Sequence, residues 1–141
     1  MRFERKGRKG FRKGREQTEN ELSNIVIKSA MRVHSALGPG LLESAYAASL
    51  CYELLQSGLR VEAQKPLPLV YHSVKLECGY RVDLLVEGKL IIEVKSVEAL
   101  DDIHLAQVLT YLRLSDLRLG LLLNFNVVHM KDGIRRVVNN L

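Results

Sequence analysis

The sequence predicts a single α/β domain in the order helix, helix, three or four strands, helix, strand, strand. Three observations predict it. The chain has 141 residues and 47% of them are hydrophobic, which is enough for one compact core. Apolar residues recur at helical spacing in two stretches before residue 57 and in one after residue 101. Between and after these stretches the apolar residues alternate or run continuously, as they do in strands.

Two helices are expected at the start of this domain. Thr18 followed by Glu21 is the pattern of a capping box, so a helix should begin there and continue to about Ala36. The Gly-Pro-Gly run at 38–40 should end it. A second helix is expected over residues 41–56. Its predicted buried stripe consists of Leu42, Ala45, Tyr46, Ser49, Leu50 and Leu54.

The remaining segments are mostly strands. Residues 60–69 contain Pro66 and Pro68, which favour an edge or irregular strand because proline donates no backbone hydrogen bond. Further segments with the composition of strands are residues 70–77, 80–86, 90–97, 117–125 and 134–138. The nearly continuous apolar run at 117–125 is typical of a strand that is covered on both faces. A helix at 103–114, begun by Asp101 and Asp102, separates it from the earlier strands.

Positive charge is concentrated at the N-terminus. The chain carries a net charge of +5, but residues 1–16 alone carry +6 and the remainder carries −1. We therefore expect a basic disordered tail at 1–17, followed by the domain at 18–141. Such a tail can bind nucleic-acid phosphates or can be a solvated extension without a function. Its cationic residues are Arg2, Arg5, Lys6, Arg8, Lys9, Arg12, Lys13 and Arg15.

The composition argues against several classes of protein. No apolar run approaches the ~18 residues of a membrane span. The basic N-terminus lacks the apolar segment of a secretory signal, so we expect a cytoplasmic protein with no membrane partner. Cys51 and Cys78 are too few for a four-cysteine zinc or iron–sulfur site, and we expect both to be buried thiols.

Charged residues interrupt two apolar strand segments between Arg81 and Val97. Asp83 lies in the first segment, and Glu93 and Lys95 lie on one face of the second. Two carboxylates about 5 Å apart on neighbouring strands repel each other at low dielectric, and a divalent cation removes this conflict. Oxygen ligands suit Mg²⁺ or Mn²⁺, and a neighbouring lysine can orient an attacking water or stabilise charge on a phosphate.

The hairpin between these strands decides whether Asp83 and Glu93 meet. A two-residue turn would place them on opposite faces, whereas a three-residue loop at 87–89 pairs them directly. Gly88 favours the longer loop, because such loops need one residue in the left-handed conformation. We therefore expect Asp83, Glu93 and Lys95 to converge as a metal-dependent phosphodiester site. A structural ion pair is the alternative interpretation of the same residues.

Polar residues on the predicted helices add to this set. Gln107 and Tyr111 lie four positions apart and share a helix face with His104, although an exposed face would explain them equally well. Glu43 lies near the start of the second helix, where an acid also complements the helix dipole.

In this order and spacing, the residues resemble the PD-(D/E)XK nuclease superfamily. The stretch GLLESAY, Gly40 to Tyr46, matches the pattern of the GxxExxY proteins, a branch of that superfamily. Asp83 and the Glu93-Val94-Lys95 run match its acidic and lysine motif, with Val82 in place of the proline. Gln107-x-x-x-Tyr111 resembles the QxxxY motif of RecB-like exonucleases. The resemblance covers everything except the basic tail.

The resemblance implies a restriction-endonuclease-like core, in which a mixed central sheet is flanked by helices in the order αβββαβ after an extra N-terminal helix. It implies a Mg²⁺ or Mn²⁺ ion held by Glu43, Asp83, Glu93 and the backbone carbonyl of Val94. Lys95 is the implied catalytic lysine, and Gln107 and Tyr111 help to position the lysine, the metal or DNA. The expected function is a deoxyribonuclease. The alternative is a non-cleaving module that binds nucleic acid or forms a complex.

The partner implied by this function is DNA, with RNA also open. A homodimer or a larger complex is equally compatible with the sequence.

Overall fold

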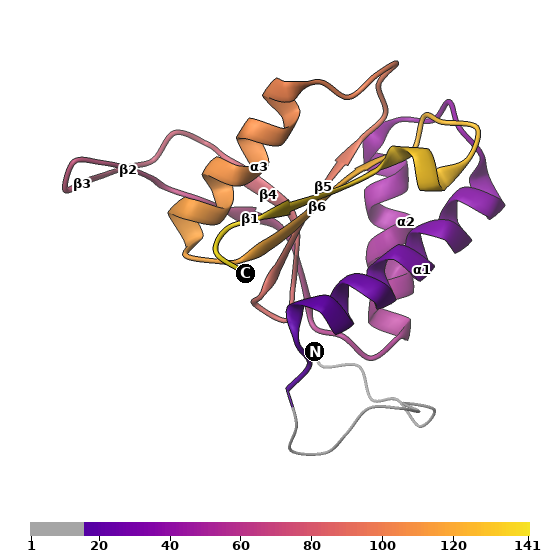
Figure 1. Ribbon diagram of the computed structural model, residues 1–141, viewed down its shortest axis with the longest axis horizontal. Helices are drawn as coiled ribbons and strands as arrows, with labels where there is room; N and C mark the ends of the chain where they lie inside the picture. Colours follow the sequence, from indigo (N-terminus) through magenta and orange to yellow (C-terminus); the bar gives the residue numbers. More distant parts are fainter. Residues whose placement is uncertain (1–15) are drawn as a thin grey trace.

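A five-stranded mixed sheet forms the centre of the protein, with helices on both of its faces (Figure 1). The computed structural model describes residues 16–141; residues 1–15, with all eight cations of the predicted tail, lie outside that part. Across the sheet, the strands are β1 (Val61–Pro66), β4 (Arg81–Val86), β5 (Leu90–Lys95), β6 (Leu119–Asn124) and β7 (Ile134–Val138). Only β5 and β6 run parallel. The predicted α/β class is confirmed.

The first helix begins and ends as predicted. Helix α1 (Glu19–Leu37) is capped by Thr18, whose hydroxyl oxygen accepts a hydrogen bond of 3.1 Å from the Glu21 N–H. The Thr18 N–H donates in return to the Glu21 carboxylate at 2.9 Å, which completes the capping box. Gly38 follows the helix with φ +70°, a conformation that favours glycine. Of the helices in the described residues, none is long and apolar enough to cross a membrane.

The second helix starts later than its sequence pattern predicts. Helix α2 (Glu43–Gln56) begins at Glu43, and Leu42 precedes it in an extended conformation. The prediction that Leu42 is buried is wrong: the residue lies before the first turn of the helix, and its side chain is 77% exposed. The rest of the stripe is partly confirmed: Tyr46, Leu50 and Leu54 are fully buried.

Helices α1 and α2 cover one face of the sheet, and α3 (Asp102–Ser115) covers the other. Strand β6 lies between these two layers, and every residue in it is buried, as the apolar run predicts. The Tyr46 ring stacks on Phe125 with 4.6 Å between the ring centres. Its hydroxyl donates to the Gly38 carbonyl at 2.5 Å and accepts from the Leu41 N–H at 3.1 Å. These contacts hold the turn that leads into α2.

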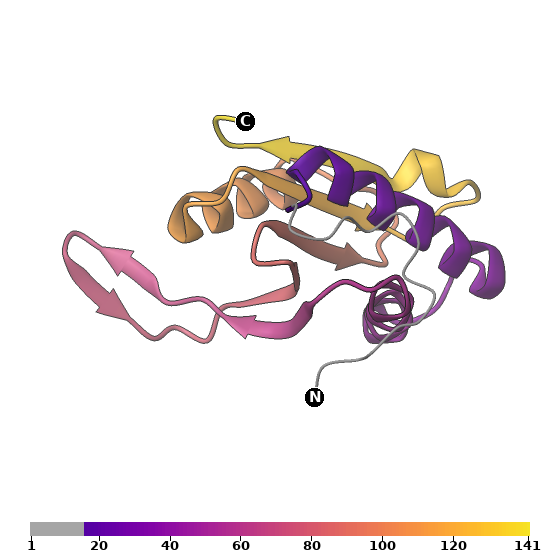
Figure 2. The same ribbon diagram turned by 90° about the horizontal axis from the view of Figure 1, so that it is seen from below.

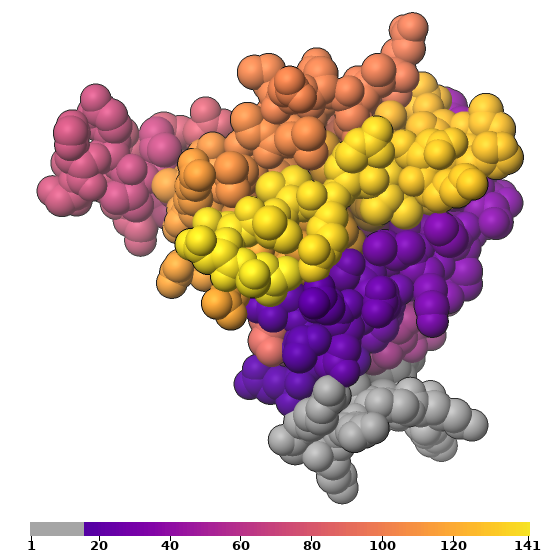
Figure 3. All heavy atoms as spheres, in the orientation of Figure 1, coloured from indigo at the N-terminus to yellow at the C-terminus, as the bar shows by residue number. Residues whose placement is uncertain are grey.

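A separate hairpin projects from the body of the protein (Figures 2 and 3). It consists of β2 (Leu69–Tyr71) and β3 (Val74–Leu76), which pair only with each other. The predicted strand at 70–77 is therefore interrupted by a turn at His72, where φ is +57°. The prediction that both cysteines are buried is wrong for Cys78, which follows this hairpin and is exposed, whereas Cys51 on α2 is half-buried.

The last part of the chain closes the sheet. A short 3₁₀ turn, η1 (Met130–Gly133), lies where the sequence predicts a turn, and β7 occupies the predicted range as an edge strand beside β6. Strand β1, which ends at Pro66, forms the opposite edge, as expected from the prolines of this segment.

Candidate active site

The loop between β4 and β5 sets the register of the site. Val86 pairs with Leu90, so the loop has the three residues 87–89 that the sequence predicts. Glu87 and Gly88 both have positive φ, at 53° and 65°, and the Lys89 N–H donates to the Val86 carbonyl at 2.9 Å. In this register Asp83 lies opposite Glu93.

The carboxylates of Asp83 and Glu93 interlock the two strands where regular pairing ends. Backbone pairing stops at Leu84 and Ile92. Beyond it, the Asp83 N–H donates to Glu93 Oε2 at 2.9 Å, and the Val94 N–H donates to Asp83 Oδ2 at 2.8 Å. Both acidic side chains are therefore held between strands that have begun to separate, and each uses one of its two oxygens for a backbone donor.

Strand β4 also changes orientation at Asp83. Residues two apart in a strand normally share a face. Here Val82 packs with the α3 layer, whereas Leu84 packs with the α1 and α2 layer. The strand thus rotates at Asp83, where its regular pairing with β5 ends.

Burial makes the acidic pair electrostatically unfavourable without a cation. Glu93 is only 5% exposed, and its pKa is raised from 4.5 to about 8, first by burial and then by the charge of Asp83. Burial also raises the pKa of Asp83, although the Val94 N–H and the charge of Lys95 oppose this shift. Two hard oxygen donors at low dielectric are a donor set that fits Mg²⁺ or Mn²⁺.

The other two predicted charges lie next to this pair. Lys95 is half-buried at the end of β5, and its positive charge lowers the pKa of both Asp83 and Glu93. The charge of Glu43, the first residue of α2, raises the pKa of both acids. The structure thus brings Glu43, Asp83, Glu93 and Lys95 within electrostatic range of one another.

Glu43 is held at the end of β5 by hydrogen bonds around Ser96. The Ser96 N–H donates to Glu43 Oε2 at 3.4 Å, and the Ser96 hydroxyl donates to the Leu41 carbonyl at 2.6 Å. Within residues 16–141, no three His, Cys, Asp or Glu side chains are already grouped as a metal site. Glu43 thus lies near the acidic pair without being grouped with it, and its Oε2 accepts from Ser96.

Tyr111 lies beside the acids on the α3 side. The side chain is buried, and its pKa is raised by burial and then by the charge of Glu93. The ring of Tyr80 lies 6.1 Å from that of Tyr111, measured between ring centres. Gln107, one turn earlier on α3, is half-buried. His104 has a local structural contact, because its Nδ1 accepts from the Asp101 N–H at 3.1 Å in the cap of this helix.

Two residues near the site carry no clear signal in the sequence. Asn124, at the end of β6, pairs with Lys95 and is almost fully buried. Its side-chain oxygen accepts from the Val97 N–H at 3.1 Å, and its amide donates to the Val97 carbonyl at 3.0 Å. A polar residue at the end of an apolar run is its only signal. Gln64 in β1 lies close enough to Asp83 to lower the pKa of that carboxyl.

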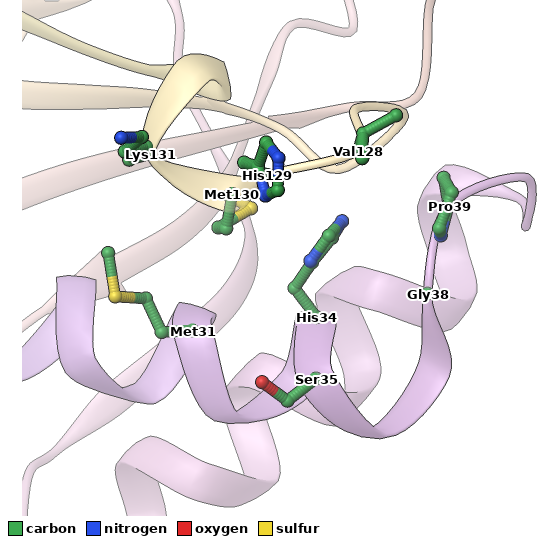
Figure 4. A pocket seen from close by; sticks show the side chains of 9 residues that line it. All are labelled: Met31, His34, Ser35, Gly38, Pro39, Val128, His129, Met130 and Lys131. Carbon is green, nitrogen blue, oxygen red and sulfur yellow. The ribbon is translucent and has the colours of Figure 1, made fainter.

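One hollow of the protein lies away from these residues. It is bounded by the end of α1 and the segment 128–131, and it includes none of the predicted site residues (Figure 4). His34 faces this hollow and is hydrogen-bonded through Nε2 to the Val127 carbonyl at 2.7 Å. His34 therefore attaches this segment to α1.

The mixed sheet and its paired strand acids define a nuclease-like α/β protein. The chain belongs to the PD-(D/E)XK nuclease superfamily: the model of that superfamily matches residues 20–137. Nucleases of this superfamily generally use divalent metal ions. Comparisons with curated proteins and with solved structures found no match. Membership of the GxxExxY branch stays a prediction.

Proposed function

We propose that this protein is a Mg²⁺- or Mn²⁺-dependent nuclease that hydrolyses phosphodiester bonds in DNA. The observation that carries the proposal is the interlocked pair of Asp83 and Glu93 with Lys95 beside it. A buried and a half-buried carboxylate with an amine form a poor structural core but a suitable centre for phosphate chemistry. Membership of a nuclease superfamily supports the same conclusion.

Each site residue has a chemical task in this proposal. Asp83 and Glu93, with Glu43 and the carbonyl of Val94, hold the divalent ion. When bound, this ion offsets the negative charge of the carboxylates and the phosphate and promotes ionisation of water. Lys95 orients the attacking water and stabilises charge that develops on the phosphate.

Two further groups complete the proposed site. Tyr111 and Gln107 position the lysine or the DNA from the α3 side. The cationic residues between Arg2 and Arg15 contribute phosphate contacts, with an affinity that falls as salt rises.

The proposal is tested with single-stranded DNA, double-stranded DNA and RNA in the presence of Mn²⁺ or Mg²⁺. Lys95→Ala and Asp83→Ala should each reduce cleavage by about 10² to 10³, as loss of a group that stabilises developing charge does. Lys131→Ala, which changes a lysine of the remote hollow, is the matched control and should cleave normally. Cleavage that survives both site substitutions would come from another site or a contaminant.

One observation favours a second candidate, a module that binds nucleic acid or a protein partner without cutting. Both acids already have backbone donors, and the raised pKa of Glu93 allows a proton to take the place of a cation. This candidate predicts DNA binding that is unaffected by Lys95→Ala, together with no heat of Mn²⁺ binding to the wild-type protein. Deletion of residues 1–15 should then remove most of the DNA affinity.

A further inference from the structure

Gln64 adopts an unusual backbone conformation beside the acidic pair. Strand β1 pairs with β4 in one unchanged register, with Ala63 opposite Leu84 and Lys65 opposite Val82. Gln64 and Asp83, which lie opposite each other between these pairs, are not paired. Gln64 has φ +54°, in the left-handed region that disfavours side chains other than glycine. Non-glycine residues in this region are typical of functional sites, where surrounding contacts hold them.

The Gln64 side chain lies next to one member of the acidic pair. It lies opposite Asp83 across the two strands, and both residues line the same hollow, yet Gln64 is exposed. A carboxamide has two N–H donors and one oxygen acceptor, so a contact with one carboxylate leaves hydrogen-bonding capacity for a ligand. Gln64 thus lies between Asp83 and the exposed surface beside β1.

That surface is a groove between α2 and the strands β1 and β4. Its volume is about 470 Å³, which is within the range of about 300 to 1,000 Å³ typical of small-ligand pockets. Side chains of α2 form one wall, including Cys51, Tyr52 and Leu55. The Tyr52 side chain is 60% exposed although it is a large aromatic. Gln64 and Asp83 lie among the mainly apolar residues that line the groove.

Asp83 belongs to both the acidic pair and the groove. A phosphodiester bound at the acidic pair carries a nucleoside on each side. Because Asp83 belongs to both the pair and the groove, one of these nucleosides would lie beside the groove. Its walls suit the base of that nucleoside, because an aromatic ring can stack on a base and an amide can hydrogen-bond a base edge.

We propose that this groove binds the base of the nucleotide next to the cleaved phosphodiester. Tyr52 is its stacking surface, and Gln64 hydrogen-bonds both Asp83 and the base. This inference rests on the proposed nuclease function and specifies its substrate: a base that is stacked and paired inside a duplex cannot enter the groove. The site therefore acts on single-stranded nucleic acid or on frayed ends.

Binding tests the role of Tyr52 without cleavage. The Lys95→Ala protein is titrated with fluorescent oligothymidylate in Mg²⁺, alone and with Tyr52→Ala or Tyr71→Ala added. Tyr71 is the matched control because its ring on the projecting hairpin is 63% exposed. We expect Tyr52→Ala to raise the dissociation constant about tenfold, as loss of one base stack does, and Tyr71→Ala to leave it unchanged. Equal dissociation constants for the two variants would overturn the inference.

Replacement by glycine separates the Gln64 side chain from its backbone conformation. Gln64→Gly retains the left-handed conformation without strain and removes the side chain with its amide. It should weaken oligothymidylate binding in the Lys95→Ala background without lowering the melting temperature. Gln64→Asn, which tolerates this conformation and keeps a shorter amide, should restore part of the affinity. Asp116→Gly, at φ +55° after α3, is the matched control and should bind normally. Wild-type affinity for Gln64→Gly would contradict the assignment.

Alkylation locates the bound base on the protein. Cys51 lies on the groove wall and Cys78 follows the projecting hairpin, so one molecule contains both the probe and its control. Saturating oligothymidylate should slow the alkylation of Cys51 several-fold and leave the alkylation rate of Cys78 unchanged. Both rates are measured by mass spectrometry. Protection of Cys51 without any cleavage by the wild-type protein would support binding of a base in the groove and refute the nuclease proposal. Cleavage without protection of Cys51 would support the nuclease proposal and refute the subsite.

Discussion

Glu93 should make the metal-free protein less stable as the pH rises. The pKa of its carboxyl is raised from 4.5 to about 8, first by burial and then by Asp83. Below pH 4.5 the group is protonated in both the folded and the unfolded chain, so it costs no stability. Between pH 4.5 and about 8 the folded protein retains a proton that the unfolded chain has released. The contribution of Glu93 to the free energy of unfolding therefore falls as the pH rises from 4.5 to about 8, and it does not change further above that pH.

The size of the effect follows from the shift. At about 1.4 kcal/mol per pH unit, a rise from 4.5 to about 8 corresponds to about 5 kcal/mol of unfolding free energy. Glu93 is only 5% exposed, so solvent screens this interaction little. Because small domains have about 5 to 15 kcal/mol of stability in total, the effect is large enough to measure.

The assay is urea unfolding of the wild-type protein and Glu93→Gln in EDTA at several pH values. Glutamine keeps an oxygen acceptor for the Asp83 N–H but does not ionise. The difference in unfolding free energy between the two proteins should change by several kcal/mol from pH 5 to pH 8, in favour of Glu93→Gln. Glu62→Gln, which changes an exposed acid of β1, should follow the wild type.

Adding Mg²⁺ should reverse the trend in the wild-type protein, because the ion and the proton compete for the same carboxyl. Stabilisation by Mg²⁺ should then be greater at pH 8 than at pH 5, and it should be weak in Glu93→Gln. Parallel stability curves for the wild type and Glu93→Gln across this window would refute the assigned electrostatics of the site.

Three further predictions concern the support of the site and its substrate contacts. Tyr46→Phe removes hydrogen bonds to Gly38 and Leu41, so it should lower the unfolding free energy by about 1 to 3 kcal/mol; an unchanged urea midpoint would contradict this role. Asn124→Ala removes both hydrogen bonds of this buried amide to the half-buried Val97 backbone and should cost about 1 to 3 kcal/mol, again by urea unfolding. Deletion of residues 1–15, which removes eight cations, should flatten the dependence of log affinity for DNA on log salt; an equal slope would exclude phosphate contacts from this segment.

Local patterns in the sequence predict most of the fold correctly. The Thr18 cap, the edge strand that ends at Pro66 and the doubly covered strand β6 are all as predicted. Each depends on interactions between near neighbours or on simple burial. The same holds for the loop that contains Gly88, whose length alone places Asp83 opposite Glu93.

Local patterns fail where the tertiary structure, and not the spacing of apolar residues, decides whether a side chain is buried. Leu42 fits the helical spacing but precedes the helix and is exposed. Cys78 is exposed because its segment follows a hairpin that leaves the sheet. The sequence contains strand-like residues there, but nothing local indicates which strands pair with the main sheet.

By itself, then, the sequence determined the order of the elements, the register of the β4–β5 hairpin and the identity of the charged residues that it brings together. Only the tertiary structure decided how buried Glu93 is, where strand β4 rotates, and that Gln64 leaves the β-sheet pairing beside Asp83. The physical reason is that residue spacing reports local geometry, whereas desolvation and strain depend on which distant segments close around a residue.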